Sequence, residues 1–154
     1  MLDEGSRRRL EGAYREYGAE VWRAIYAYSG GSRHIADEAV AEAFAQAGRG
    51  LDRIRDLRPW LFRAAFKIAA GELKQRPAPS LRPPAPQDGQ GMMELLDLAR
   101  SLTSAQRRAF ALRDVLGFSS REAAKLMGTS EVAVRVHLHA AHRRLRALVL
   151  EAES

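Results

Sequence analysis

The chain has 154 residues, a formal net charge of +6 and no cysteine. This length accommodates one ordinary domain or two small ones, and the lack of cysteine excludes disulfides and thiolate metal sites, as is usual in a reducing cytoplasm. No stretch approaches the roughly 18 apolar residues of a membrane span, and residues 1–10 lack the apolar run of a signal peptide. We therefore expect a cytoplasmic protein without membrane insertion.

The N-terminal part of the chain predicts three helices. Apolar and aromatic residues keep helical spacing over residues 7–29, 32–47 and 59–75. Ser32 is suited to cap the second helix, and Pro59 is suited to the first turn of the third. We find no strand pattern, because no alternation of apolar and polar residues persists along the chain.

Residues 77–91 differ in composition from the rest, since they are rich in proline and glycine. Such a segment is typical of a semi-stiff linker. It predicts an all-α protein of two small helical domains, residues 1–76 and residues 92–154, joined by this linker. Each predicted domain has a small core, so we expect modest stability.

Two helices are predicted directly after the linker, over residues 92–100 and 105–116. Thr103 or Ser104 would cap the longer one. Its apolar residues would form a core with the segment that follows, residues 118–146.

Residues 118–146 have the pattern of a helix-turn-helix. Ser119 or Ser120 would cap a short helix, and Gly128 would end it in the left-handed conformation that favours glycine. Ser130 would then cap a second, longer helix after only a brief turn. A short helix, a Gly-polar turn and a long helix together indicate insertion into DNA.

The second of these helices has two distinct faces. The residues of its apolar stripe are Val134, Leu138, Ala141, Leu145 and Leu148. The residues around that stripe are mainly basic, which suits a polyanion, although a solvated basic face is the simpler alternative. A metal site is not indicated, because His137 and His139 point to nearly opposite sides of a helix.

Four segments stand in a definite order along the chain. They are an acidic helix at residues 36–44, a Pro-Trp-Leu sequence at 58–65, and the helix-turn-helix segments at 102–110 and 117–128. In this order, with a proline-rich linker in the middle, they resemble the extracytoplasmic-function sigma factors. These are two-domain bacterial initiation factors that direct RNA polymerase to promoters, and the resemblance covers nearly the whole chain.

The resemblance implies three binding surfaces, no active site and no cofactor. The surface for the polymerase core would consist of Asp37, Glu38, Val40, Glu42 and Phe44. The surface for the −10 element would consist of Arg53, Arg55, Arg58, Trp60, Arg63 and Lys67. The surface for the −35 element would consist of Arg121, Ser130, Glu131, Ala133, Arg135, Val136, His137, Arg143 and Arg144. The implied partners are bacterial RNA polymerase core, promoter DNA and an anti-sigma factor, which family members commonly have.

The chain departs from the family pattern at Ala41, Lys67 and Gly71, where the family usually has Gln, Asn and Asp. Lys67 falls in the helix that helps to capture a flipped promoter base, so a second interpretation stays open. That alternative is a helix-turn-helix DNA-binding regulator of sigma-like fold that no longer supports promoter opening. An enzyme is not indicated, because the chain has no Gly-rich phosphate loop, Ser-His-Asp order or metal-ligand spacing.

The aromatic residues of the third predicted helix have two interpretations. Trp60, Phe62 or Phe66 could stack on the bases of a displaced strand. Trp60 and Phe66 also keep helical spacing with apolar neighbours, which favours a place in the core.

Overall fold

The computed structural model describes residues 2–75 and 98–153, and these two ranges contain helices and no strand. The predicted all-α fold class is therefore confirmed. The N-terminal helices are α1 (Glu4–Tyr28), α2 (Arg33–Arg49), the 3₁₀ turn η1 (Leu51–Arg53) and α3 (Leu57–Gln75). The C-terminal helices are α5 (Ser104–Phe110), the π-helical turn η2 (Ala111–Val115), α6 (Ser120–Met127) and α7 (Glu131–Glu153). The predicted linker at 77–91 lies outside the described residues, as does most of the helix predicted at 92–100.

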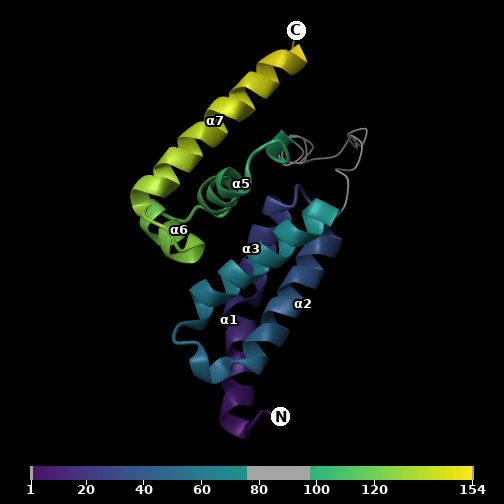
Figure 1. The fold of residues 1–154 in the computed structure, drawn as a ribbon, viewed down its shortest axis with the longest axis vertical. Coiled ribbons are helices and arrows are strands. Elements are labelled where there is room, and N and C mark those ends of the chain that lie inside the picture. The colour runs from purple at the N-terminus through teal and green to yellow at the C-terminus, as the bar shows by residue number, and fades with distance from the viewer. Residues whose placement is uncertain (1, 76–97, 154) are drawn as a thin grey trace.

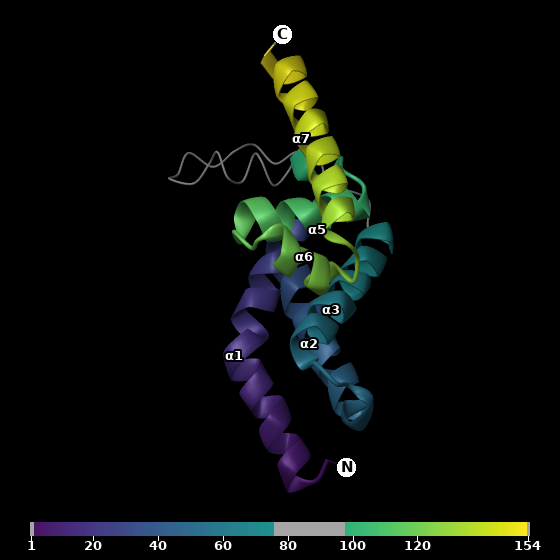
Figure 2. The same cartoon turned by 90° about the vertical axis from the view of Figure 1, so that its left-hand side faces the viewer.

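The N-terminal helices form a three-helix bundle, and the two chain ends lie at opposite ends of the molecule (Figures 1 and 2). Helix α1 starts three residues before the predicted start at Arg7, because Asp3 caps it by accepting a hydrogen bond from the Ser6 amide at 2.7 Å. Ser32 caps α2 as predicted, through the Ile35 amide at 3.1 Å.

Helix α3 begins at Leu57, two residues before the predicted start at Pro59. The first turn of a helix leaves its amides without helical acceptors, so a proline anywhere in that turn forfeits no helical bond. The segment before α3 is anchored by Arg9, whose guanidinium donates to the carbonyls of Leu51 and Ile54 at 3.1 and 2.8 Å. The start of α3 is thereby fixed against α1.

The predicted single helix at 105–116 is in fact two elements. Thr103 caps α5 in a reciprocal capping box with Gln106, at 3.2 and 3.1 Å. The chain then widens into η2, where the Leu116 amide bonds to the Ala111 carbonyl. Hydrophobic spacing does not distinguish this wider turn from an α-helix, because its inward residues are buried in either case.

The predicted turn of the helix-turn-helix is confirmed in its caps. Ser119 accepts from the Glu122 amide, and Ser130 accepts from the Ala133 amide, both at 3.1 Å. Gly128 ends α6 with φ of 71°, in the left-handed region. Of the predicted stripe on α7, Val134, Ala141 and Leu145 are buried, whereas Leu138 and Leu148 are half-buried.

The N-terminal and C-terminal helices pack against each other through a continuous apolar core. The ring of Phe62 on α3 meets the ring of Phe118, just before α6, edge-to-face with centroids 6.1 Å apart. Figure 2 shows α6 lying beside α3 and α7 extending away from the bundle. The expected boundaries of two domains stay a prediction.

Candidate nucleic-acid interface

The leading end of α7 is open. Ser130, Glu131 and Arg135 are exposed, and 60% of Val136 is accessible. Ala133 and His137 are partly exposed. The six residues of the predicted −35 surface that lie at this end of α7 are therefore all accessible.

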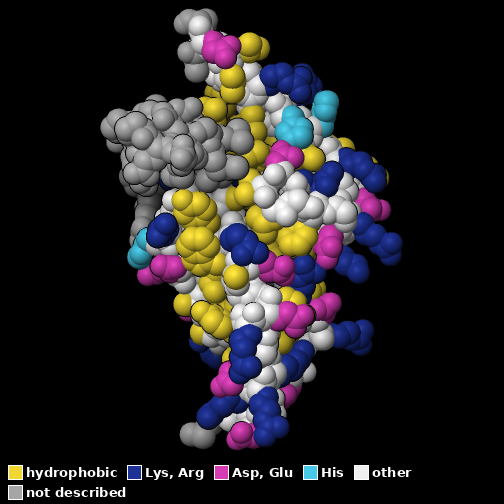
Figure 3. Space-filling model, turned by 180° about the vertical axis from the view of Figure 1, so that it is seen from behind, with side chains coloured by type: hydrophobic (Ala, Val, Ile, Leu, Met, Phe, Trp, Pro, Cys, Tyr) yellow, Lys and Arg dark blue, Asp and Glu magenta, His cyan; other side chains and the backbone are white. Residues whose placement is uncertain are grey.

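Further along α7, Arg143 and Arg144 are exposed, and so is Arg121 on α6. Figure 3 shows Lys, Arg and His side chains gathered around this helix. His142 differs from its neighbours, because its Nε2 lies 2.5 Å from Asp114 Oδ2 on η2. This contact joins α7 to η2.

The residues predicted for the −10 element fall into two groups. Arg53, Arg55, Arg63 and Lys67 are exposed, whereas Arg58 is half-buried. Arg58 bonds to α6, and the exposed Arg63 also passes close to Gly128.

The aromatic side chains of α3 also divide. Phe62 and Phe66 are fully buried, which contradicts the interpretation that they could stack on bases. Their spacing places them on the face of α3 that closes the core. Trp60 is partly buried.

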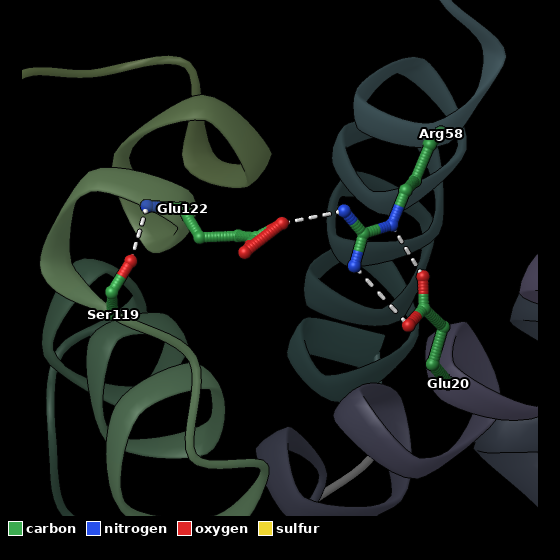
Figure 4. Close-up of polar contacts among 4 residues, drawn as sticks. All are labelled: Glu20, Arg58, Ser119 and Glu122. Atoms are coloured by element: carbon green, nitrogen blue, oxygen red, sulfur yellow. Dashed lines mark hydrogen bonds and ion pairs between the residues drawn. The ribbon is translucent and has the colours of Figure 1, made fainter.

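Arg58 lies between two carboxylates that come from different parts of the chain (Figure 4). Its Nε and Nη2 donate to the two oxygens of Glu20 on α1, at 2.6 and 3.3 Å. Its Nη1 donates to Glu122 Oε1 on α6 at 2.7 Å. Hydrogen bonding to Glu20 raises the pKa of the Arg58 guanidinium above its ordinary value, with a smaller contribution from Glu122.

The same guanidinium is enclosed by aromatic rings. Its central carbon lies 5.4 Å from the ring centroid of Phe118 and 5.9 Å from that of Tyr17. Rings at this distance attract a cation electrostatically. Arg58 is thus held in one orientation by charge and by the rings of both halves.

Arg63 contacts the turn between α6 and α7. A Cβ added at Gly128 would lie 3.0 Å from the Cδ of Arg63, so this side chain runs across the bare glycine. The Arg63 Nε donates to the Pro59 carbonyl at 3.2 Å. The turn of the helix-turn-helix therefore packs directly on α3.

A second contact joins the end of α1 to α5. Arg107 donates to the Tyr28 carbonyl at 2.6 and 3.0 Å, and its guanidinium lies 4.5 Å from the centroid of the Tyr28 ring. Burial lowers the pKa of Arg107. The hydroxyls of Tyr28 and Ser104 are 2.8 Å apart. Sequence reasoning did not identify these residues, because their spacing in the chain carries no sign of their pairing.

The acidic residues predicted to bind polymerase lie on the outer side of α2. Asp37, Glu38 and Glu42 are exposed, whereas Val40 and Phe44 belong to the core and expose only 6% and 8% of their surface. The open part of this predicted surface is therefore its carboxylates.

Each of these three carboxylates has a neighbour within the N-terminal helices. Asp37 accepts from the Trp22 indole at 2.7 Å, Glu38 lies 3.6 Å from the His34 ring, and Glu42 accepts from Arg49 at 3.1 Å. These partners orient the carboxylates and leave them at the surface.

None of the helices within residues 2–75 and 98–153 combines the length and apolar character that a membrane span requires.

Comparison with known proteins gives one family match and structural neighbours. Residues 92–145 match the family model described as sigma-70, region 4. That range includes α5, α6 and the leading part of α7, which carries the open surface described above. No curated protein sequence matches the chain.

Two solved structures are similar over nearly the whole chain. CnrH, solved in complex with the cytosolic domain of CnrY, is 24% identical with a TM-score of 0.72, over 96% of this chain and 91% of that chain. The complex of the sigma factor RpoE with the anti-sigma factor NepR from Bartonella quintana gives 17% identity and a TM-score of 0.70, over 92% of this chain and 97% of that chain. At these identities the likeness shows the fold. The C-terminal part of the chain therefore matches the sigma-70 region 4 family model, and the chain has the fold of these two solved structures, in agreement with the predicted resemblance to extracytoplasmic-function sigma factors.

Proposed function

We propose that this protein is a sigma factor that binds RNA polymerase core and directs it to promoters, and that it contributes no active site of its own. The observation that carries the proposal is the coincidence of two features. The segment that matches region 4 is also the segment whose second helix presents Arg135, Val136 and neighbouring polar residues to solvent. An exposed leading end on the second helix is what base readout in a major groove requires.

Three surfaces bind the promoter and the polymerase core. The leading end of α7, with Arg121, Arg143 and Arg144, contacts the −35 element. The basic residues of η1 and α3 contact the −10 element. The carboxylates of α2, namely Asp37, Glu38 and Glu42, bind a basic surface of the polymerase core, where complementary charge speeds association and selects the partner.

The domain division belongs to the same proposal: residues 1–76 serve the core and the −10 element, residues 92–154 serve the −35 element, and residues 77–91 connect them. An anti-sigma factor is a further proposed partner. Its support is that RpoE was solved with an anti-sigma factor, and CnrH with the cytosolic domain of CnrY.

The deciding experiment mixes the full chain with polymerase core and measures co-elution, followed by run-off transcription from a set of promoter fragments. Co-elution with transcripts supports an initiation factor. DNA binding without co-elution or transcripts supports the alternative, a regulator of sigma-like fold that has lost promoter opening, for which Lys67 in place of the family's Asn is the supporting observation.

The carboxylates of α2 supply the matched variants. Reversing Glu38 and Glu42 together to Lys should weaken core binding by about tenfold or more, because two attractive contacts become repulsive. The fold should lose under about 0.5 kcal/mol per site, since both side chains are exposed. Reversing the exposed Glu4 and Glu11 at the far end of α1 is the control. Equal core affinity of the α2 variant and the wild type would remove this helix from the polymerase surface.

A further inference from the structure

Two of the basic residues proposed for the −10 element lie against the C-terminal helices, although Arg63 is exposed and Arg58 is half-buried. Arg58 is bound by Glu122 of α6, and Arg63 lies across Gly128. A guanidinium has a limited number of donors in a fixed fork. Three of the five N–H donors of Arg58 are used, Nε and Nη2 by Glu20 and Nη1 by Glu122, so a phosphate in this arrangement would have to share the group with two carboxylates.

The Glu122 carboxylate that bonds to Arg58 resembles a DNA phosphate in its chemistry. A carboxylate oxygen 2.7 Å from a guanidinium nitrogen is a charge-assisted hydrogen bond of the kind that a phosphate oxygen also forms. Glu122 therefore stands where a backbone phosphate would bind. The side chains of Arg58 and Glu122 keep 25% and 42% of their surface accessible, so water and salt reach the pair.

Glu122 also has a second partner within its own helix. Ser119 and Glu122 have the spacing of a capping box, in which the glutamate side chain reaches back to the backbone amide of the N-cap residue. Half of that motif is present, because Ser119 already accepts from the Glu122 amide at 3.1 Å. The glutamate side chain itself extends to Arg58 (Figure 4). If the Glu122 side chain left Arg58, it could bond to the Ser119 backbone amide and complete the capping box. This new bond would lower the free-energy cost of separating the two sets of helices.

We propose that the bridge from Glu20 through Arg58 to Glu122 is a latch that holds the two sets of helices together, and that DNA competes with Glu122 for Arg58. In the closed state the −35 surface of α7 is open while Arg58 is bonded to Glu122. In the open state Arg58 keeps Glu20, which comes from its own bundle, and exposes the edge that Glu122 held. This inference rests on the proposed function, because it assumes that α3 contacts DNA.

The latch acts by changing the population of the open state. When only a fraction of molecules can bind, the apparent dissociation constant rises by the inverse of that fraction. Of the hydrogen bonds that Arg58 makes, the one to Glu122 crosses between the two sets of helices, and Glu122 can be changed without removing a residue proposed to touch DNA. Glu122→Gln removes the charge and keeps a side chain that can still complete a capping box.

The first measurement is the separation of the two sets of helices in the full chain. The protein has no cysteine, so Ala45→Cys on α2 and Ala147→Cys on α7, both at exposed positions, take a fluorescent donor and acceptor specifically. We expect Glu122→Gln to lower the transfer efficiency. Raising salt from about 50 to about 500 mM should do the same in the wild type and have less effect in the variant, because salt screens the bond that the variant lacks. Glu11→Gln, which removes an exposed pair with Arg15 inside α1, is the matched control.

The second measurement is the affinity of the same proteins for a duplex oligonucleotide with a central unpaired bubble. Glu122→Gln should bind about three- to tenfold more tightly than the wild type, as expected when a partly exposed charged contact no longer favours the closed state. Adding Arg58→Ala to Glu122→Gln should abolish that gain. A residue with a merely structural role would weaken binding when changed, not strengthen it.

The outcomes separate the two proposals. Unchanged transfer efficiency in Glu122→Gln, together with a salt response equal to that of the wild type, overturns the latch. Opening without tighter binding overturns the competition with DNA and leaves the proposed function intact. If no form binds the oligonucleotide, with or without polymerase core, the proposed function fails and the competition fails with it, whereas the transfer efficiencies still decide whether Glu122 holds the closed state.

Discussion

The two surfaces proposed for DNA differ in how they are held. On α7, Arg135 and Val136 project from the leading end of a helix that packs only through its opposite side. On α3, Arg58 is bonded to α6 and half-buried, and the exposed Arg63 passes beside the turn that follows α6. Both surfaces carry arginines on helices, so composition alone does not separate them.

Which side chains of a helix are exposed therefore depends on how all the helices pack together. The apolar stripe of α7 packs on α5 and α6, and the described residues leave Arg135, Arg143 and Arg144 exposed on its other side. Helix α3 is enclosed on one side by its own bundle and on the other by α6, and arginine is the residue that joins them because it can bond carboxylates and lie on rings at once. Under the proposed function, the −35 residues are accessible as they stand, whereas Arg58 of the −10 surface would first have to leave Glu122.

The largest expected effect is a loss of DNA binding on changing arginines of the exposed surface of α7. Arg135→Ala should cost about 1–3 kcal/mol of binding on the preferred sequence and relax the preference at one base position, if Arg135 contacts a guanine edge. Arg144→Ala should weaken all sequences alike and reduce the slope of the salt dependence by roughly one. The measurement is binding of each full-length variant to a randomised duplex pool at two salt concentrations. An unchanged preference in Arg135→Ala would exclude this residue from base readout.

Local features of the fold were predictable because local rules govern them. Ser32, Ser119 and Ser130 cap the helices that follow, since a hydroxyl near a free amide satisfies it wherever the rest of the chain lies. Gly128 ends α6 because few other residues adopt its backbone angles easily. The register of the helix-turn-helix follows from these positions.

The closure of α6 on α3 was not predictable in the same way. Arg58 and Glu122 are 64 residues apart, and neither stands out within its own helix, where each is one charged residue among several. Phe62 and Phe66 likewise have the spacing of an amphipathic helix whether that face meets protein or DNA bases. Patterns along one helix define its faces, but the identity of what covers a face is set by tertiary packing.

A loss of stability of intermediate size is expected at Gly128, in the turn that packs on α3. Gly128 and Gly117 both have positive φ, of 71° and 78°, so Ala at either site should cost about 1–2 kcal/mol of unfolding free energy from the backbone alone. Gly128→Ala also brings a Cβ 3.0 Å from the Arg63 Cδ, whereas nothing lies within 4 Å at Gly117. Urea unfolding of the two variants should show the larger loss for Gly128→Ala, and the difference measures the contact with Arg63. Equal losses would mean that Arg63 moves aside without cost.

The smallest expected effect concerns the contact between His142 on α7 and Asp114 on η2. His142 and Asp114 lie 2.5 Å apart, with 41% and 34% of their side chains accessible, and both belong to the C-terminal helices. A double-mutant cycle of His142→Ala and Asp114→Ala should give a coupling energy of about 0.2–1 kcal/mol, the range of partly exposed pairs. Because the pair joins α7 to η2 and not one set of helices to the other, neither variant should change the separation of labels on α2 and α7. A change as large as that of Glu122→Gln would mean that the direction of α7 and the closure on α3 are one coupled property, and the contrast between a ready surface and a held one would disappear.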